Sequence, residues 1–483
     1  MKKRRLFLAT IVALVCTVGF SSCVAQRDAV SIVSIEKTAS EGLIDTYTIY
    51  YSDGSEYSFQ VTNGANGETG AVGDKGEKGD KGDDGEDVTV QALHEAYVAE
   101  HGEIAYEDFL ALYMTLQTDN FTTINRCLQS AVKIYSEFRE PNEEKGNVIA
   151  PTAYTGAGVV YKIDDDYTYF LTNYHVVHSA DAIGSAISQK IHLYLYGSES
   201  KPTAHRDAND VITQITYDEY AIPCEYIGGA ITCDVAMVRA ETAKVKQINE
   251  NICEIQFADD YFVGQTAFTI GNPLGEGISV TEGIVSIKDD YIELAIDETV
   301  RTYRSVRMDT ALYGGNSGGG LFNASGELIG LSNAGRKEVE NINFAVPLPI
   351  VKGVAYNVMK HHFDGNAQTL GVYKVKLGLT IESRNSKYVY DADKGYGKIV
   401  EEILVREIAE NSIASRFGLQ TGDTLKAMQV DGVSYALDRD FHISDALFYA
   451  TAGAEIAFVY ERNGVTSTSN AYTVKASDLT LVN

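Results

Sequence analysis

Three short segments of the sequence carry the side chains that acyl transfer requires. His175 lies in the apolar run FLTNYHVV, which predicts an imidazole at the end of a strand. Asp234 opens the run DVAMV, and a carboxylate entering such a run needs a partner because burying it unpaired is costly. Ser317 lies among glycines in GGNSGGG, directly before an apolar strand. A core histidine, a turn-capping aspartate and a glycine turn would explain each segment alone, so only their combination indicates catalysis.

Together the three side chains predict nucleophilic catalysis. A serine hydroxyl is a poor nucleophile and needs a neighbouring base, which His175 would provide for Ser317. Asp234 would hold the imidazole in the correct tautomer and stabilise its charged form. Glycine permits backbone geometries closed to other residues, so we expect Gly315, Asn316 and Ser317 to form an oxyanion hole in which the Gly315 and Ser317 N–H groups point at one spot.

Motifs in the order His, Asp, Ser resemble the HtrA (DegP-like) family of trypsin-like serine proteases. The resemblance implies a mainly β fold, with a two-barrel, chymotrypsin-like protease domain over residues 124–358. It covers about 200 residues. The motifs that carry it are TNYHVV, DVAMV, IGNPLG (270–275), VTEGIVS (280–286), MDTA (308–311), GNSGG, NASGELIG (323–330) and INFAVP (342–347).

The same resemblance places the floor of the substrate pocket near Ala311 and its walls at Leu331, Ser332 and Asn333. No acidic residue occupies position 311, so a basic P1 side chain would lack a counter-charge. We therefore expect a small or medium apolar P1 residue. The interval between the catalytic histidine and aspartate is longer than is usual in the family, and residues 190–222 are expected to form an added surface excursion.

Residues 370–478 resemble a PDZ domain. Leu377, Gly378, Leu379 and Thr380 match its carboxylate-binding loop, and this domain binds a peptide C-terminus by strand addition. The resemblance implies substrate docking or activation by peptide C-termini, with a spacer domain without ligand as the alternative. Residues 383–402 are expected to form a long polar insertion that crowds the groove.

The N-terminus predicts export. Lys and Arg at positions 2–5 precede the apolar run 6–20, as in a secretory signal peptide. The following FSSC resembles a lipobox, so residues 1–23 form a lipoprotein signal peptide and Cys23 is the lipidated residue. This predicts an extracytoplasmic lipoprotein at the cell membrane. The alternative is ordinary cleavage near Ala25, which would give a secreted protein.

Three small segments precede the protease domain. Residues 30–62 alternate apolar and polar side chains, which predicts a small β module that serves as a stalk. Residues 64–87 are eight Gly-X-Y triplets without proline, a collagen-like segment that forms either a flexible charged spacer or a local trimer. Residues 90–120 show helical spacing and predict a helical linker.

Composition excludes several functions. The net charge of −27 disfavours nucleic acid as a partner. No phosphate-binding loop and no CxxC pair occurs, so we expect no cofactor and no metal. A turn at Gly228-Gly229 would place Cys224 opposite Cys233, and this pair is either a cross-strand disulfide or two buried thiols.

These observations predict an extracytoplasmic serine endopeptidase that degrades misfolded or surface proteins. Family resemblance suggests a homotrimer. A protease-like chaperone or peptide-binding surface protein is the competing reading, since the stalk and a peptide groove would also serve binding alone. The intact His175, Asp234 and Ser317 favour the enzyme.

Overall fold

The computed structural model describes residues 32–62 except 42–43 and 52–54, isolated positions between 94 and 109, and residues 120–482 except 297–298, 336–338, 340, 364–369 and 393–394. The chain divides into two compact units, residues 1–93 and 94–483. The predicted signal peptide with Cys23, the Gly-X-Y segment and most of the predicted helical linker lie outside the described residues. In the first unit, β1 (Ile32–Glu41), β2 (Ile44–Tyr51) and β3 (Glu56–Thr62) form an antiparallel sheet in sequence order.

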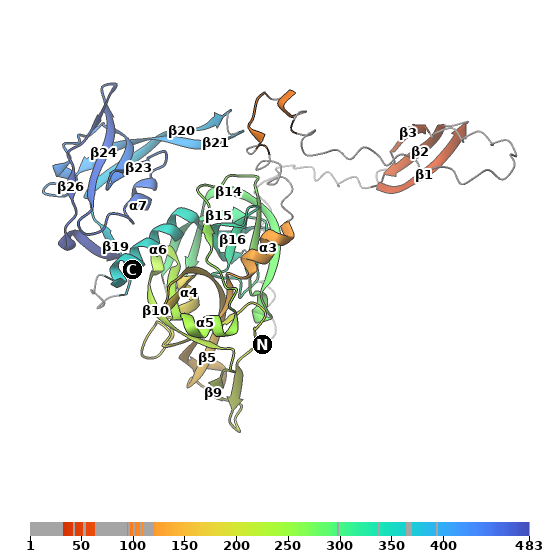
Figure 1. Cartoon of the computed structure of the whole chain (residues 1–483), viewed down its shortest axis with the longest axis horizontal. Helices are drawn as coiled ribbons and strands as arrows, with labels where there is room; N and C mark the ends of the chain where they lie inside the picture. Colours follow the sequence, from red (N-terminus) through yellow and green to blue (C-terminus); the bar gives the residue numbers. More distant parts are fainter. Residues whose placement is uncertain are drawn as a thin grey trace, which may run out of the picture. The chain divides into compact units, whose positions relative to one another are not determined.

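The second unit begins with a closed six-stranded barrel in the order β10-β11-β6-β5-β4-β7 (Figure 1). Its strands alternate side chains between two faces, and the inward face is apolar, with Ile134, Phe170 and Val238 fully buried. The strands are β4 (Ala131–Asn142), β5 (Val148–Ile163), β6 (Tyr167–Thr172), β7 (Lys190–Leu195), β10 (Ile222–Ala230) and β11 (Val235–Glu241).

A second barrel follows. Its strands run β17-β16-β13-β14-β15-β18, and the additional pairing of β17 with β18 closes the ring, while β12 adds to the outside of β17. The strands are β12 (Gln256–Phe257), β13 (Thr266–Gly271), β14 (Ser279–Ala295), β15 (Val300–Met308), β16 (Gly320–Asn323), β17 (Glu327–Gly335) and β18 (Asn343–Pro347). The predicted mainly β, chymotrypsin-like architecture with a β-barrel is therefore confirmed.

Short helices connect and cover the barrels. They are α3 (Asn120–Leu128), α4 (Tyr174–Val177) and α5 (Thr242–Ile248). Within the long interval 190–222, β8 (Thr203–Arg206) and β9 (Ile212–Thr216) pair as a hairpin that projects from the first barrel (Figure 1). Every residue of β8 is exposed, as expected for a surface excursion.

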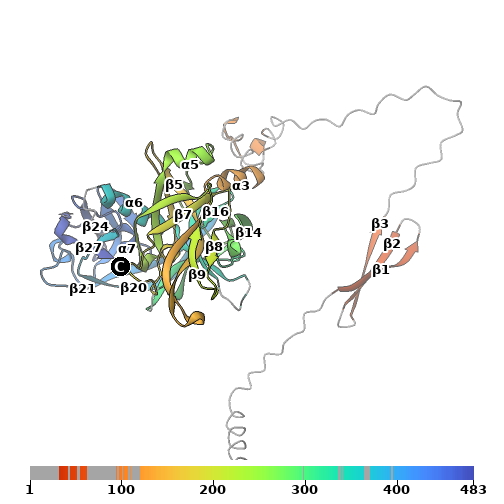
Figure 2. The same ribbon diagram turned by 90° about the horizontal axis from the view of Figure 1, so that it is seen from below.

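Helix α6 (Leu348–Phe363) lies between the barrels and the C-terminal module, which Figure 2 shows from a second direction. Buried apolar residues of α6, including Val351 and Val358, share one core with both barrels. Asn357 joins the helix to the module: its amide nitrogen donates to the backbone oxygens of Tyr373 and Phe448 at 2.8 Å. Because this buried amide is fully used, it fixes the helix against the module.

The C-terminal module is a five-strand path, β20-β21-β22-β24-β25, with helix α7 and a separate β19–β27 pair. The residues expected to form a polar insertion, 383–402, continue β20 and β21 as a long antiparallel ribbon. The elements are β19 (Val372–Val375), β20 (Leu379–Asp391), β21 (Tyr396–Ile408), β22 (Thr424–Val430), β23 (Val433–Ala436), α7 (His442–Ala446), β24 (Glu455–Arg462), β25 (Val465–Thr468), β26 (Tyr472–Thr473) and β27 (Leu479–Val482).

The proposed cross-strand disulfide is wrong in its geometry. The turn between β10 and β11 lies at residues 231–234 rather than at Gly228-Gly229, since Ala230 pairs with Val235. Cys224 instead lies opposite Ile191 on the other neighbouring strand. Both Cys224 and Cys233 are free thiols in the structure, which leaves the alternative of two separate thiols.

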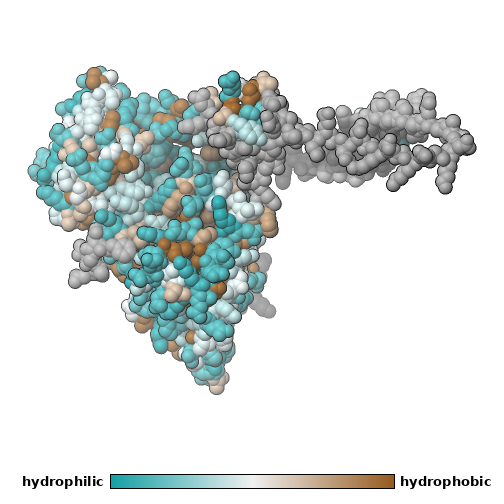
Figure 3. Space-filling model, in the orientation of Figure 1, coloured by the Kyte–Doolittle hydropathy of each residue, from teal (hydrophilic) through white to brown (hydrophobic). Residues whose placement is uncertain are grey.

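Hydrophilic residues cover most of the described surface on the face drawn in Figure 3, with apolar residues in small groups. This agrees with the strongly acidic composition. Among the residues that the structure describes, no helix has the length and apolarity needed to cross a membrane.

Candidate active site

The core of the site is a contact between His175 and Asp234. His175 lies in the four-residue helix α4, directly after β6, and Asp234 ends the tight turn before β11. Asp234 adopts the left-handed conformation (φ 50°), which aspartate tolerates better than most residues. Its carboxylate is fully buried and lies 2.9 Å from Nδ1 of His175, and it also accepts the His175 backbone N–H at 3.0 Å. A carboxylate is an acceptor only, so Nδ1 carries the proton of the neutral ring and Nε2 is the nitrogen that can accept another.

The electrostatics of this pair favour a charged imidazole. Burial alone would lower the pKa of His175, but the charge of Asp234 and the hydrogen bond to it outweigh burial and raise the pKa above its ordinary value of 6.5. Asn173, just before α4, donates its amide to the backbone oxygen of Asp234 at 2.9 Å. Three donors therefore join the segment of His175 to Asp234: the Asn173 amide, the His175 backbone N–H and His175 Nδ1.

Ser317 is held against β5 and against the residues that precede His175. Its backbone oxygen accepts the Ala157 N–H at 2.8 Å, and the next residue, Gly318, packs so closely on Thr172 and Asn173 that a Cβ there would overlap them. The hydroxyl of Ser317 donates to the backbone oxygen of Asn333 at 3.2 Å, and no hydrogen bond joins it to His175 in this structure.

The loop before Ser317 contains two backbone N–H groups with no acceptor among the described residues. The backbone oxygen of Gly314 accepts the Leu274 N–H at 2.6 Å, and Gly315 has φ +100°. A trans peptide points its N–H opposite to its carbonyl, so this bond fixes the direction of the Gly315 N–H. No described group accepts a hydrogen bond from the N–H of Gly315 or of Ser317. The N–H of Asn316 differs, because it donates to Tyr313 at 3.0 Å and shapes the turn instead of facing a ligand.

Residues 156–331 match the family of trypsin-like peptidase domains. Serine protease Do-like HtrB of Bacillus subtilis (strain 168) is 27% identical over 331 residues, covering 67% of this chain and 62% of the relative. Serine endoprotease DegS of Haemophilus influenzae (strain ATCC 51907 / DSM 11121 / KW20 / Rd) is 26% identical over 285 residues, covering 58% of this chain and 66% of the relative. Residues 156–331 are thus a trypsin-like peptidase domain, and over a wider span the chain is similar to HtrA-type serine proteases.

This HtrA-like chain thus spans less than two thirds of the length of the first of these relatives. Among solved structures, the HtrA-type protease AlgW with a decapeptide has 19% sequence identity and a TM-score of 0.44, covering 74% of this chain and 99% of that chain.

The residues expected to form the substrate pocket of the HtrA-like domain divide into two groups. Ala311 is half-buried, and its backbone oxygen accepts the Thr281 hydroxyl at 3.0 Å. Leu331 is fully buried in the shared core, and the hydroxyl of Ser332 donates to the backbone oxygens of Asn316 and Gly319. The side chains of Leu331 and Ser332 are therefore not pocket walls, because each is used inside the protein.

Asn333 has a role that its sequence context did not indicate. Its side-chain amide donates to Oδ2 of Asp234 at 2.8 Å, and its backbone oxygen is the acceptor of the Ser317 hydroxyl. It was expected as a pocket wall, whereas its side chain supports the buried acid. The only signal in the sequence was its place in the apolar strand β17, and this does not reveal a partner 99 positions away.

The four residues expected at a peptide-binding loop lie at the start of β20. Leu377 is buried and Gly378 has φ +72°, and their backbone oxygens accept the N–H groups of Ala414 and Ala409. Leu379 and Thr380 then pair with β21. Strand β20 is the end of its sheet path, so its outer edge has no strand partner among the described residues.

Proposed function

We propose that this chain is an HtrA-like serine endopeptidase in which Ser317 is the nucleophile, His175 the general base and Asp234 the orienting acid. The observation that carries the proposal is the buried carboxylate of Asp234, which binds Nδ1 of His175 and, through Asn333, reaches the hydroxyl of Ser317. These contacts support a site in which the base, the acid and the nucleophile act together.

The mechanism follows from the same atoms. The imidazole of His175 accepts the hydroxyl proton as Ser317 attacks the substrate carbonyl, and the Gly315 and Ser317 N–H groups stabilise the oxyanion. The imidazolium then gives its proton to the leaving amine, and an acyl-enzyme remains on Ser317. Water, activated by His175, releases the acyl group. No cofactor enters any of these steps.

Substrates in this proposal are unfolded or surface proteins, with a small or medium apolar P1 residue. The C-terminal module acts as a PDZ domain that docks peptide C-termini. The open edge of β20 and the loop at Leu377 to Thr380 support this role, because strand addition needs a free strand edge beside a loop. The chain is proposed to act outside the cytoplasm, anchored by lipid on Cys23 or, in the alternative, secreted, and to assemble as a trimer.

A second function has one observation in its favour. The hydroxyl of Ser317 is bonded to Asn333 rather than to His175, which is the arrangement of a resting or weakly active site. A peptide-binding chaperone that cleaves poorly would have this geometry permanently. An enzyme awaiting substrate would leave it when a peptide binds.

Labelling with an organofluorophosphonate probe separates the two. The endopeptidase should label at Ser317, digest casein and lose both properties in Ser317→Ala, and an added C-terminal peptide should raise both rates if the PDZ domain activates. Absence of labelling and of casein digestion, with and without the peptide, would leave the chaperone. Incorporation of labelled fatty acid that disappears in Cys23→Ala tests the anchor.

A further inference from the structure

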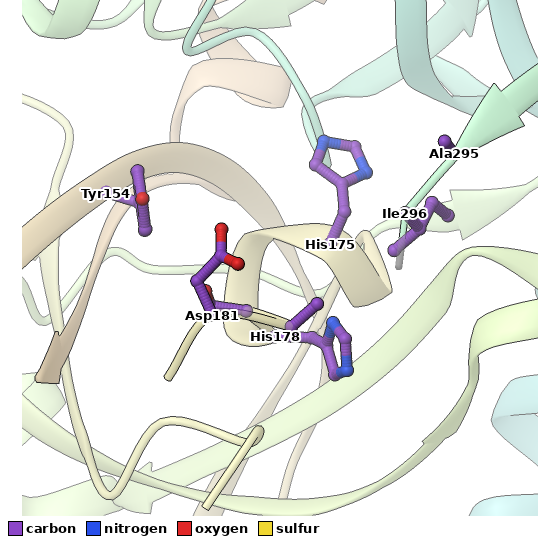
Figure 4. A pocket seen from close by; sticks show the side chains of 8 residues that line it. Tyr154, His175, His178, Asp181, Ala295 and Ile296 are labelled. Carbon is purple, nitrogen blue, oxygen red and sulfur yellow. The ribbon is translucent and has the colours of Figure 1, made fainter. Parts of the chain in front are cut away.

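A hollow of about 330 Å³ opens beside His175, away from the residues that the sequence assigned to substrate binding. Three segments distant in sequence form it: strand β5, helix α4 with the loop after it, and the end of β14. Figure 4 shows the labelled side chains arranged around the space. The lining residues are Tyr154, His175, His178, Ser179, Ala180, Asp181, Ala295 and Ile296.

The position of the hollow identifies the part of a substrate that would enter it. Strand β17, through Asn333, contacts both Asp234 and Ser317, and no residue of β17 lines the hollow. Of His175, Asp234 and Ser317, only His175 lines the hollow. Because the imidazole passes its proton to the leaving amine, the chain that follows the scissile bond must run past His175. The hollow therefore lies on the leaving-group side.

The chemistry of the lining is uneven. Asp181 is exposed, and no ion pair with it occurs among the described residues. Nearby, buried Glu140 accepts the Tyr154 hydroxyl at 2.7 Å and also the Ser179 hydroxyl, so it holds two walls of the hollow in place. Burial raises the pKa of Tyr154, and its bond to Glu140 and the charges of Glu140 and Asp181 raise it further, so the phenol stays neutral.

The opposite wall is apolar. Ala295 and half-buried Ile296 face the space across from Asp181 (Figure 4). A long basic side chain matches this pattern, because its methylene stem packs on apolar surface while its charged end reaches a carboxylate. The ring of Tyr154 offers the same stem a second flat surface. An acidic side chain would meet the negative charge of Asp181 and be disfavoured.

We propose that this hollow is the subsite for the first residues after the scissile bond and that it selects lysine or arginine there. The selection is made by Asp181, with Tyr154 and Ile296 as the walls. This rests on the proposed endopeptidase function and adds to it the specificity of the leaving-group side.

Acyl transfer tests the subsite directly. An ester substrate loads Ser317, and added amino-acid amides then compete with water for the acyl-enzyme from the leaving-group side. Arginine amide and lysine amide should give more transfer product than leucine amide, and glutamate amide should give least. Asp181→Asn should reduce the arginine-to-leucine ratio about two- to fivefold, the size expected of one exposed charge pair. Asp181→Lys should reverse the preference toward glutamate amide.

The control is Asp165→Asn, which removes one exposed acid that does not line the hollow and should leave the ratio unchanged. The ester hydrolysis rate tests the endopeptidase function separately from the subsite. Ester hydrolysis with equal transfer to all amides, or a ratio unchanged in Asp181→Asn, would overturn the subsite alone. A wild-type protein that hydrolyses no ester would overturn the endopeptidase function and the subsite together.

Discussion

The side-chain amide of Asn333 donates to the buried carboxylate of Asp234 at 2.8 Å, which makes Asn333 a positioning residue for the acid. Replacing it by valine removes this donor from a buried charge. A hydrogen bond to a charged group contributes about 1.5–3 kcal/mol, so we expect kcat/KM of Asn333→Val to fall about ten- to hundredfold. The value of kcat/KM for peptide cleavage, measured over a range of pH for wild type and variant, tests this prediction.

A structural role alone would not move the pH profile, whereas loss of this donor should. The amide holds the Asp234 carboxylate in place beside His175, so its removal changes the field at the imidazole. Asn333→Ser keeps a hydroxyl donor and should restore part of the rate. If Asn333→Val cleaves as fast as wild type with the same profile, the carboxylate does not depend on this amide.

The pH dependence of cleavage should reflect the raised pKa of His175. Below that pKa the imidazole carries a proton and cannot accept one from Ser317. The rate should therefore increase with pH, with a midpoint above the ordinary 6.5. Asp234→Asn removes the charge and leaves the burial, so the midpoint should move below 6.5 while kcat falls about 10⁴-fold. A wild-type midpoint at or below 6.5 would contradict the arrangement described for the pair.

The oxyanion loop offers a matched pair of glycine substitutions. A Cβ on Gly315 would lie 2.3 Å from the backbone oxygen of Asn272, and φ +100° is strained for alanine, so Gly315→Ala must displace the loop. Loss of one oxyanion donor costs about 10²–10³ in kcat, and we expect a fall of this size. Gly314→Ala is the control, because a Cβ there has no neighbour within 4 Å.

Both variants should be compared by kcat and by thermal unfolding. The expected result for Gly315→Ala is a loss of kcat larger than its loss of stability would explain at the assay temperature. Equal activity in the two alanine variants would mean that the Gly315 N–H takes no part in the reaction.

Local pattern in the sequence was sufficient to predict the segments that meet at the site. An apolar run before His175, an acid opening another run and a serine among glycines are short-range features, and each lies at a strand end as expected. The two-barrel fold was expected from the family resemblance. Contacts between distant strands could not be predicted from local sequence pattern. In the sequence, Asn333 looks like one more residue of a buried strand, and only the fold shows its contact with Asp234.

Two features of the structure were not predicted, for different physical reasons. Gly228 and Gly229 resemble a hairpin turn, but they lie inside β10 because neighbouring atoms leave no room for side chains: Val358 of α6 packs on the first and the backbone of Val235 on the second. The real turn uses Asp234 in the left-handed conformation, which sequence rarely reveals. Most of the described residues in the 383–400 part of the β20–β21 ribbon are exposed, so that part lacks the apolar alternation that marks a half-buried strand.

A buried ion pair joins the second barrel to the C-terminal module. Arg304 on β15 donates to both carboxylate oxygens of Asp445 on α7 at 2.8 Å, and only 6% of the Arg304 side chain is exposed. Its guanidinium also stacks on the ring of Phe441 at 3.9 Å. Removing one partner of such a pair leaves an uncompensated buried charge, so Asp445→Asn should lower the free energy of unfolding by about 3–5 kcal/mol.

Urea unfolding followed by circular dichroism measures this loss. The matched control is Lys244→Gln, which breaks the exposed pair with Glu241 and should change stability by less than about 1 kcal/mol. The double variant Arg304→Met with Asp445→Leu removes both charges together and should recover much of the loss, because apolar residues can fill a buried ion-pair site. If Asp445→Asn is as stable as the Lys244→Gln control, water reaches Arg304 and the two parts of the unit are not held by this pair.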